Sequence, residues 1–544
     1  MVTVTDQGTP GRTVRDATMD VFREYGLDTI FSNPGSTEVP FLTDLPSDLE
    51  FVLGLHEGSV VGMATGWALA NERPALVLLH TTAGLGNAVS ALATARVNRA
   101  PLVVIVGQQD RRHLALEPFL AGRLEGLAGD YPVWVNHPAR AQDVPGAVAR
   151  ASHEAAHGKG PAVVIVPMDD WSEPAGDPAN HAAARRVLRG GDADPAAVAA
   201  VAELLRGART PALVVGSGAD SEPSWRALVD LAEKLRCPVF QECFGARAGF
   251  PQDHPQFAGF LPADRPRLRA RLEPYDAVLS VGAPVFRQYP FTEGLLFPRD
   301  LRIAVVSEDP EEVHRSPAEL GVHASIAAFV NALVTEVDPR PDRDLPGPRA
   351  TEHPEAPGPT EPLRAAHVLS ALAQRAAEDT VFVEETPSSR PDMHQLLPAR
   401  RPMGFLSAAM GGLGFALPAA TGVRMASPRR PVIAVVGDGS ALYQVQALWS
   451  AARYQVGVLF IVLANGRYAV MDRLADHHGG KPAWPAFEDV SLSGLARSLG
   501  CATREISDHT TLLETLDEVL PSLADRSEPL LLDVAVTPDL TFQP

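Results

Sequence analysis

Short, continuously apolar runs recur along nearly the whole chain, and they constrain its fold more than any other feature. Each run is rich in valine, isoleucine or leucine, and many end in glycine or proline. The eight clearest are PALVLLH (74–80), PLVVIVG (101–107), PAVVIVP (161–167), PALVVG (211–216), DAVLSVG (276–282), LRIAVVS (301–307), PVIAVVG (431–437) and VLFIVLA (458–464). Such runs are typical of strands that are buried on both faces of a parallel sheet.

The segments between these runs show the 3–4 spacing of amphipathic helices. One such set of apolar residues is Val14, Ala17, Val21, Phe22 and Tyr25. Strands that alternate with helices are typical of βαβ units, which build parallel sheets with helices on both faces. We therefore expect an α/β fold made of doubly wound parallel sheets.

Two polar stretches interrupt this alternation. Residues 172–195 are rich in proline, glycine and aspartate, and residues 338–362 are richer still in proline and charge, as in an extended linker. A chain of 544 residues also exceeds what one hydrophobic core holds. The sequence therefore predicts three units, 1–180, 190–337 and 363–544, with 338–362 as the linker between the last two.

Charge and cysteine content exclude several classes of protein. The formal net charge is −19, and no basic block suggests nucleic acid or an anionic membrane as a partner. The three cysteines, Cys237, Cys243 and Cys501, lack the spacing of a zinc site or a disulfide framework. The first residues lack the apolar core of a signal peptide, and no run approaches the roughly 20 apolar residues that cross a bilayer. We expect a cytoplasmic protein that binds neither nucleic acid nor a membrane.

The stretch VVGDGS (435–440) places an acid, Asp438, directly after a buried strand and between two glycines. A buried carboxylate is costly unless it is paired or holds a metal. The run VLFIVLA ends in a similar way, with Asn465 just beyond it and 27 residues after Asp438. Because that is the size of a βαβ unit, adjacent parallel strands should bring both side chains to one sheet edge. Oxygen ligands of this kind suit Mg²⁺ or Ca²⁺, with phosphate completing the coordination.

Two other interpretations stay open at this point. Asp438 can be a turn aspartate that is followed by an unrelated Asn-Gly turn. The segment VVGSGADS (214–221) has a Gly-x-Gly after a strand, which is a partial signal for a protein that binds a Mg²⁺-nucleotide or a dinucleotide. A full dinucleotide fingerprint needs a third glycine at the start of the helix.

The stretch GDGSALYQVQALWSAARYQVGVLFIVLANGRY (437–468) resembles the thiamine diphosphate-dependent 2-keto acid decarboxylase and carboligase family. The resemblance implies that the cofactor is thiamine diphosphate and that its metal is Mg²⁺ or Ca²⁺. It assigns the metal to the side chains of Asp438 and Asn465 and to the main-chain oxygen of Arg467. Ala464 replaces the first of the two usual asparagines, which is not the one that coordinates. The resemblance also implies cofactor contacts from Gly439, Ser440, Tyr468 and Ala469.

Three further segments resemble the family's cofactor site. LGLHEGSVVGMATGWALA (53–70) places Glu57 at the head of a helix, where the family's glutamate binds the aminopyrimidine of the cofactor. SAAMGGLGFALPAATG (407–422) contains Gly411, whose carbonyl meets the cofactor's amino group, and Leu413, which bends its two rings against each other. In EETPSSRPD (384–392), Pro387 stands where a threonine is usual, which leaves Ser388 as the implied phosphate contact.

The strings NPGS (33–36) and GAPVFR (282–287) resemble the family members that decarboxylate benzoylformate. In those enzymes a serine and two histidines line the substrate site. The serine corresponds to Ser36 and the first histidine to His80, but the second falls at Tyr289. A phenol titrates near about 10 and an imidazole near about 6.5. Tyr289 therefore suits hydrogen-bond donation better than it suits proton abstraction at neutral pH.

The resemblance covers the whole chain and implies three domains. They are a pyrimidine-binding domain (1–180), a middle Rossmann-like domain (190–337) and a diphosphate-binding domain (363–544). The implied reaction is the non-oxidative decarboxylation of a benzoylformate-like, other aromatic or branched 2-keto acid to an aldehyde. The residues that it assigns to catalysis are Glu57, Ser36, His80 and Tyr289.

Alternatives to this reaction remain, because Tyr289 departs from the pattern. Within the family, the chain can be a carboligase or a C–C lyase, like acetolactate synthase or benzaldehyde lyase. A more distant alternative is a non-catalytic, nucleotide-binding relative. In the family the pyrimidine and metal sites meet across a subunit interface, which implies a homodimer or homotetramer with a small 2-keto acid as its substrate.

Overall fold

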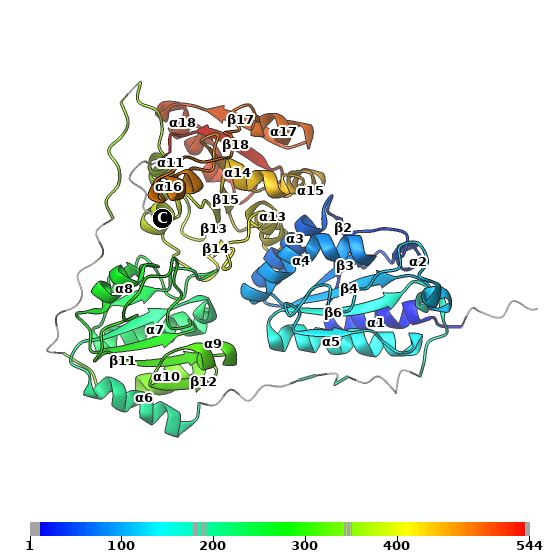
Figure 1. Ribbon diagram of the computed structural model, residues 1–544, viewed down its shortest axis with the longest axis horizontal. Coiled ribbons are helices and arrows are strands. Elements are labelled where there is room, and N and C mark those ends of the chain that lie inside the picture. Colours follow the sequence, from blue (N-terminus) through cyan, green and yellow to red (C-terminus); the bar gives the residue numbers. More distant parts are fainter. Residues whose placement is uncertain are drawn as a thin grey trace, which may run out of the picture.

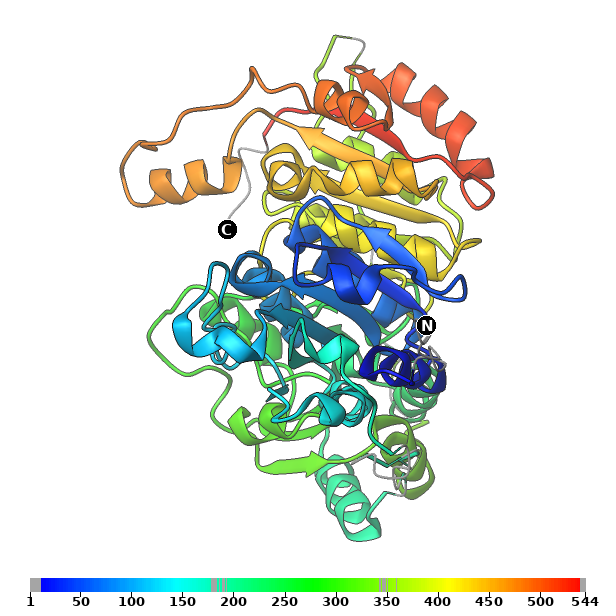
Figure 2. The same ribbon diagram turned by 90° about the vertical axis from the view of Figure 1, so that its right-hand side faces the viewer.

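The computed structural model describes residues 11–177, 183–184, 186–187, 191, 193–341, 344, 349, 351–358 and 360–538. These residues form three lobes, each built on one six-stranded parallel sheet that is flanked by helices (Figure 1). In Figure 1 the N-terminal lobe is blue to cyan, the middle lobe is green and the C-terminal lobe is yellow to red. Figure 2 turns the N-terminal lobe toward the viewer, with the C-terminal lobe above it. The expected α/β fold with three parallel sheets is confirmed.

The N-terminal sheet has the strand order β2-β1-β3-β4-β6-β5. Its strands are β1 (Thr29–Asn33), β2 (Glu50–Leu53), β3 (Ala75–His80), β4 (Leu102–Gln108), β5 (Trp134–Asn136) and β6 (Pro161–Pro167). Its helices are α1 (Val14–Tyr25), α2 (Val39–Leu42), α3 (Glu57–Asn71), α4 (Thr81–Val97) and α5 (Val144–Gly158). Strands β4 and β6 are buried along their whole length, as the apolar runs predict for central parallel strands.

The C-terminal sheet repeats this topology, with the order β14-β13-β15-β16-β18-β17. Its strands are β13 (Val381–Glu385), β14 (Phe405–Ser407), β15 (Val432–Gly437), β16 (Leu459–Ala464), β17 (Ala502–Ile506) and β18 (Leu530–Ala535). Its helices are α11 (Ala365–Ala373), α12 (Arg390–Leu396), α13 (Ala416–Ala426), α14 (Asp438–Ala441), α15 (Ala447–Arg453), α16 (Ala469–His477), α17 (Leu492–Ser498) and α18 (His509–Val519). Strand for strand, β3 therefore corresponds to β15, and helix α3, which follows β2, corresponds to α13, which follows β14.

The middle sheet has a different order, β12-β11-β10-β7-β8-β9. The chain adds β8 and β9 on one side of β7 and then β10, β11 and β12 on its other side, with all strands parallel. Its strands are β7 (Pro211–Val215), β8 (Val239–Gln241), β9 (Phe257–Phe260), β10 (Ala277–Val281), β11 (Arg302–Ser307) and β12 (Leu320–His323). Its helices are α6 (Pro195–Gly207), α7 (Glu222–Leu235), α8 (Arg265–Leu272), α9 (Pro310–Arg315) and α10 (Ile326–Glu336). This is the doubly wound, Rossmann-like order.

All eight apolar runs of the sequence form strands in these sheets, and residues 14–25 form the expected helix α1. The described residues between 175 and 194, and those of 338–362, form neither helix nor strand. Within the described part of the chain, no helix is long and apolar enough to cross a membrane.

Helices α3 and α13 join the N-terminal and C-terminal lobes, and both are buried along most of their length. Their backbones touch at glycines. A Cβ atom on Gly66 would lie 2.1 Å from the carbonyl oxygen of Ala419, and one on Gly422 would lie 1.9 Å from that of Met63. No side chain fits at either position, so these glycines set the closeness of the crossing.

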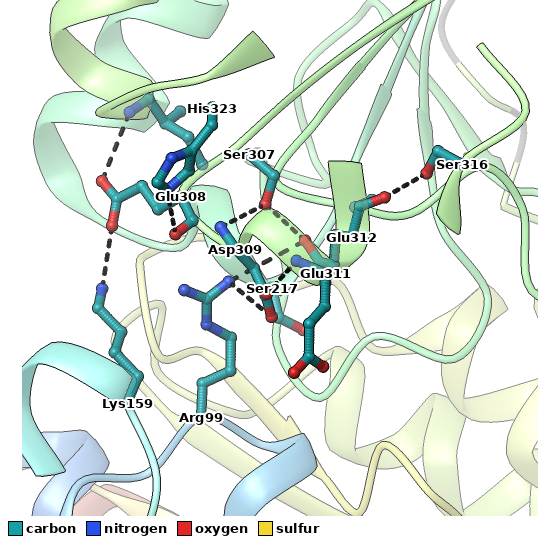
Figure 3. Close-up of polar contacts among 12 residues, drawn as sticks. Arg99, Lys159, Ser217, Ser307, Glu308, Asp309, Glu311, Glu312, Ser316 and His323 are labelled. Carbon is teal, nitrogen blue, oxygen red and sulfur yellow. Dashed lines mark hydrogen bonds and ion pairs between the residues drawn. The ribbon is translucent and has the colours of Figure 1, made fainter. Parts of the chain in front are cut away.

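Charged side chains join the N-terminal lobe to the middle lobe (Figure 3). Lys159, after α5, lies 3.2 Å from the Glu308 carboxylate. Arg99, after α4, faces Asp309 and Glu312 at 3.7 and 4.0 Å. Both acidic residues nearest to these cations, Glu308 and Asp309, follow β11 at the carboxyl edge of the middle sheet. This charged seam therefore lies where ligands often bind in open α/β sheets.

The Gly-x-Gly of the middle lobe, Gly216 and Gly218, also lies at this edge, after β7. A Cβ on Gly216 would lie 2.6 Å from the Ala283 side chain, and one on Gly218 would lie 2.8 Å from the Cα of Gly282. Both glycines are therefore needed for close packing against the loop after β10. This packing explains the Gly-x-Gly without a bound nucleotide.

Candidate active site

Asp438 lies at the carboxyl end of β15 and begins the short helix α14. One carboxylate oxygen, Oδ1, accepts the backbone N–H of Gly439 at 2.8 Å. The other, Oδ2, accepts the backbone N–H groups of Asn465 at 2.7 Å and of Gly466 at 2.6 Å. Strands β15 and β16 are adjacent and parallel. The structure thus brings Asp438 and Asn465 together at one sheet edge, as their spacing predicts.

The surroundings of Asp438 suit a metal cation. Burial raises the pKa of this carboxyl, and the N–H donors act against that rise. The nearby charge that affects it is another acid, Asp533, which raises the pKa further. A divalent cation would offset the cost of burying this carboxylate near a like charge. In the described part of the chain there is no cluster of three or more His, Cys, Asp or Glu, so a metal here depends on amide and main-chain oxygens.

The turn after β16 holds the other expected ligands. The Asn465 side-chain oxygen accepts the backbone N–H of Arg467 at 3.1 Å. The Arg467 guanidinium points elsewhere, toward Glu488 at 3.4 Å and Asp472 at 3.8 Å. Only the main-chain oxygen of Arg467 is therefore available as a metal ligand, which is the role that the sequence resemblance gives it.

The other residues that the resemblance assigns to the cofactor surround this turn. Tyr468 caps α16, and its ring lies over Gly439, where an added Cβ would approach the ring to 2.6 Å. Ser440 is buried in α14, and Ala469 is the first residue of α16. Ser388, from the loop after β13, accepts the backbone N–H of Val470 at 3.0 Å. The structure therefore gathers the residues that we expect to bind the diphosphate and the metal, from the ends of β13, β15 and β16, around the N-terminus of α16.

Glu57 is the first residue of α3, and its side chain is held by two amides. Asn33, at the end of β1, donates to Oε1 at 3.4 Å, and Asn87 of α4 donates to Oε2 at 3.1 Å. Both amides donate to the carboxylate and fix its position at the start of α3. The sequence analysis did not single out either asparagine, although Asn33 belongs to the NPGS string.

His80 ends β3, and its ring is fixed by residues of the loop after β1. Its Nδ1 lies 3.0 Å from the Glu38 carboxylate and 2.9 Å from the Thr37 hydroxyl. A carboxylate only accepts hydrogen bonds, so Nδ1 is the donor in the contact with Glu38, and Nε2 is the ring nitrogen that this contact leaves unused. Glu38 is almost fully buried and also accepts the N–H of Gly35 at 2.8 Å. Glu38 was not predicted from the sequence, although it follows Ser36 by only two residues.

Ser36 lies beside this histidine and is exposed. Its neighbour Gly35 packs against the His80 ring, where a Cβ would lie 2.4 Å from the ring. The structure therefore brings Ser36 and His80 to one edge of the N-terminal sheet. The close approach explains why a glycine precedes the serine.

Gly411 and Leu413 lie in the loop between β14 and α13. Gly411 has a φ of +74°, and a Cβ placed on it would meet no atom within 4 Å, so this backbone borders open space. At the start of the loop, the buried Asn98 side chain donates to the Ser407 carbonyl and accepts the Ala409 N–H, both at 2.9 Å. The loop is thus bound to the N-terminal lobe from one side.

The end of this loop is held by Glu385, the last residue of β13. Its carboxylate accepts the N–H groups of Gly414, Phe415 and Ala416 at 2.6, 2.8 and 2.7 Å. Burial raises the pKa of Glu385 to about 7, and the three donors act against that rise. The sequence analysis quoted this glutamate within EETPSSRPD but assigned it no role.

Tyr289 stands apart from these groups in the middle lobe. Its side chain is 57% exposed, and its N–H donates to the Ala263 carbonyl at 2.9 Å. The peptide bond to Pro290 is cis, and the next residue, Phe291, is also exposed. Nearby, Arg287 pairs with the buried Glu242 at 2.7 Å and reaches the Ala409 carbonyl at 3.4 Å. The Tyr289 loop is therefore connected to the segment before Gly411 through Arg287.

Comparisons with known proteins agree with this arrangement. Residues 12–126 match the thiamine pyrophosphate enzyme N-terminal TPP binding domain, residues 198–333 its central domain and residues 388–534 its C-terminal TPP binding domain. The chain is 39% identical to a benzoylformate decarboxylase of Pseudomonas aeruginosa, over 98% of this chain and 100% of the relative. It is 29% identical to a putative acetolactate synthase large subunit of Mycobacterium tuberculosis, over 96% of this chain and 98% of the relative.

A solved structure of the same fold also matches nearly the whole chain. The thiamine diphosphate-dependent 4-hydroxybenzoylformate decarboxylase of Rhodococcus jostii RHA1 superposes with a TM-score of 0.92 at 34% identity. The match covers 97% of this chain and 100% of that one. The chain therefore belongs to the thiamine pyrophosphate enzyme family, whose cofactor is also called thiamine diphosphate.

Proposed function

We propose that the protein decarboxylates an aromatic 2-keto acid of the benzoylformate type to an aldehyde, with thiamine diphosphate as cofactor. The observation that carries this proposal is His80, a histidine fixed by Glu38 beside the exposed Ser36. Release of an aldehyde requires a proton at the carbon that has lost CO₂, whereas joining to a second carbonyl does not. A histidine that is fixed in this way therefore favours release of the aldehyde over joining to a second carbonyl. The 39% identity to a benzoylformate decarboxylase supports the substrate class.

The residues of the C-terminal lobe would hold the cofactor's diphosphate. Asp438, Asn465 and the main-chain oxygen of Arg467 supply hard oxygen ligands for Mg²⁺ or Ca²⁺, and Ser388 supplies a hydroxyl for a phosphate oxygen. Gly439 lets the backbone approach the phosphates closely. We expect Ser440, Tyr468 and Ala469 to complete this side of the site. When bound, the cofactor supplies the electron sink for loss of CO₂.

The N-terminal lobe and the loop after β14 would orient and activate the cofactor. Glu57, held by Asn33 and Asn87, would accept a hydrogen bond from the aminopyrimidine ring. The Gly411 carbonyl would accept one from its amino group, and Leu413 would keep the two rings bent. Ser36 would donate to the substrate carboxylate, and Nε2 of His80 would exchange a proton with the reacting centre.

A second candidate, a carboligase, has its own support. Tyr289 stands where the sequence resemblance implies a histidine, and the chain is 29% identical to a putative acetolactate synthase subunit. A tyrosine there would transfer protons poorly near neutral pH. A slower proton delivery would leave more time for capture by an acceptor carbonyl.

We further propose that the protein is a homodimer or homotetramer. Large apolar side chains next to the expected cofactor site are exposed in the single chain, among them Met410, Tyr443, Tyr468 and Met471. In α16, only Ala469 is buried, although the helix is amphipathic. A second copy that covers these side chains would also bring its Glu57 to the metal site. Sedimentation analysis of the holoprotein tests this state, and a monomer with full activity would contradict it.

The decisive assay supplies purified apoprotein with thiamine diphosphate and Mg²⁺ and measures CO₂ release from a panel of 2-keto acids. We expect aromatic 2-keto acids to be the preferred substrates. Product analysis with and without an added aldehyde separates the decarboxylase from the carboligase. Absence of CO₂ release from every 2-keto acid would overturn the proposed function. The assay uses the full chain. We propose 1–180, 190–337 and 363–544 as the limits of its three domains.

A further inference from the structure

The loop that carries Gly411 and Leu413 is fixed at its two ends by residues from other parts of the fold. Asn98 binds Ser407 and Ala409 at its start, and Glu385 binds Gly414, Phe415 and Ala416 at its end. Between these two ends, residues 410–413 include the exposed Met410 and Gly411. The position of the middle of the loop therefore depends on how firmly its ends are held.

Glu385 replaces a helix cap that the local sequence does not provide. The residue before α13 is Phe415, which has no side-chain acceptor for the first N–H groups of the helix. Those N–H groups form the positive end of the helix dipole and need an acceptor when buried. The Glu385 carboxylate is itself 5% exposed and takes three of these donors at once.

Glu385 also connects this loop to the end of β15, where Asp438, the expected metal ligand, lies. It ends β13, and its backbone pairs with Val436 of β15, two residues before Asp438. A displacement of the Glu385 side chain would therefore shift the loop of Gly411 and Leu413 relative to a fixed diphosphate site. Small displacements of positioning groups cost catalysis steeply, with about 1 Å worth about 10²-fold.

We infer that Glu385 is a positioning residue for the cofactor's aminopyrimidine. It accepts the N–H groups of Gly414, Phe415 and Ala416. It thereby holds Gly411 and Leu413 in the position that contact with the bound cofactor requires. This inference rests on the proposed function. Glu385 does not touch the reacting atoms and acts only through the loop.

Glu385→Gln is the sharpest test of this role. The amide keeps the size of the side chain, but only one of its two terminal atoms accepts hydrogen bonds. If the amide oxygen keeps Phe415 and Ala416, the NH₂ group faces the N–H of Gly414, directly after Leu413. The matched control is Asp170→Asn, which alters another buried carboxylate, paired with Arg111 at 2.7 Å in the N-terminal lobe.

Two measurements separate positioning from stability. Amide hydrogen exchange of the apoprotein should show faster exchange at residues 411–416 in Glu385→Gln and no change there in Asp170→Asn. In the holoprotein, hydrogen–deuterium exchange at C2 of bound thiamine diphosphate should slow by about 10–100-fold in Glu385→Gln, with cofactor affinity little changed. Wild-type exchange in both measurements would overturn the inference.

The remaining outcomes are also decisive. If wild-type protein fails to bind thiamine diphosphate, the proposed function fails, while the apoprotein measurement still tests the hold of Glu385 on the loop. If Glu385→Gln does not fold, Glu385→Asp takes its place, because it keeps the charge but withdraws the carboxylate from the loop. If neither variant folds while Asp170→Asn does, Glu385 has a purely structural role and the inference is wrong.

Discussion

The N-terminal and C-terminal lobes share one strand order but place different chemistry at corresponding points. The end of β3 carries His80, which is braced by the Glu38 carboxylate. The end of the corresponding strand, β15, is followed by Asp438, which is held by backbone N–H groups. One strand end thus has a histidine that is paired with a carboxylate, and the other has a carboxylate that accepts main-chain N–H groups.

This difference shows how one topology can divide the work of a single site. Parallel sheets place strand ends at the same edge, so any side chain at that point is available for function. The identity of that side chain and its immediate partners then determine whether it moves protons or binds a metal. We expect variants of Glu57 and His80 in the N-terminal lobe to affect rate, and variants of Asp438 in the C-terminal lobe to affect cofactor binding.

The largest effect should come from Glu57→Gln. A neutral amide keeps the shape of the side chain but does not favour the cofactor tautomer that removes its own C2 proton. We expect C2 hydrogen–deuterium exchange to slow by about 10²–10⁴-fold. Cofactor affinity should stay near the wild-type value, because the expected metal site is unchanged. Exchange at the wild-type rate would remove Glu57 from the mechanism, and Asn87→Ala, which removes one of its two amide donors, should give a smaller loss.

Asp438→Ala should lower cofactor affinity, which Glu57→Gln should leave unchanged. Without this carboxylate, the expected metal site loses its only acidic ligand. We therefore expect thiamine diphosphate to bind about 100-fold more weakly in the presence of Mg²⁺. Chelation followed by gel filtration should likewise give an inactive wild-type apoprotein, which the cofactor and Mg²⁺ reactivate. Calorimetric titration of the apoprotein measures the affinity, and His80→Ala is the control that should retain it. Normal affinity in Asp438→Ala would show that the metal lies elsewhere.

A smaller effect is expected from Tyr289→His in the middle lobe. A histidine in this position should raise the decarboxylation rate and lower the ratio of acyloin to aldehyde, since imidazole transfers protons near neutral pH. Turnover and product ratio should be compared for wild type, Tyr289→His and Tyr289→Phe with the same 2-keto acids. If Tyr289→Phe equals wild type and Tyr289→His gains no turnover, the tyrosine only shapes the pocket.

The smallest effect on catalysis should come from substitutions where α3 crosses α13. This crossing joins the N-terminal and C-terminal lobes. Gly422→Ala forces a methyl group against the Met63 carbonyl, and we expect a loss of about 1–3 kcal/mol in stability. Gly86→Ala is the matched control, because Gly86 is an exposed position of α4 with no atom near its added Cβ, and it should stabilise slightly. Differential scanning calorimetry compares the two. Equal melting temperatures would mean that the lobes do not depend on this contact.

The sequence was sufficient for the parts of the structure that depend on local pattern. The eight apolar runs predict the central strands because burial on both faces leaves no other composition. The distance from Asp438 to Asn465 predicts their meeting because one βαβ unit fits between them. Both inferences use residues that are close in the chain.

The residues that hold the site in place could not be found in this way. Asn98 binds the loop of Ser407 across the boundary between two lobes, and Glu385 caps a helix that starts 31 residues later. Neither residue has a local motif, because the partner of each is set by packing between distant segments. The shared topology of the first and third lobes was also hidden, since no sequence repeat accompanies it.

The seam between the N-terminal and middle lobes has a consequence for how such chains diversify. It is made of charged side chains such as Lys159 with Glu308 and Arg99 with Asp309, whereas α3 and α13 meet backbone to backbone. Exchanging the charges of an ion pair between its two members restores the attraction, but no second substitution makes room for a methyl group against a carbonyl. The charges of this seam can therefore change in matched pairs from one relative to another, while the glycines at the crossing of α3 and α13 have to be kept.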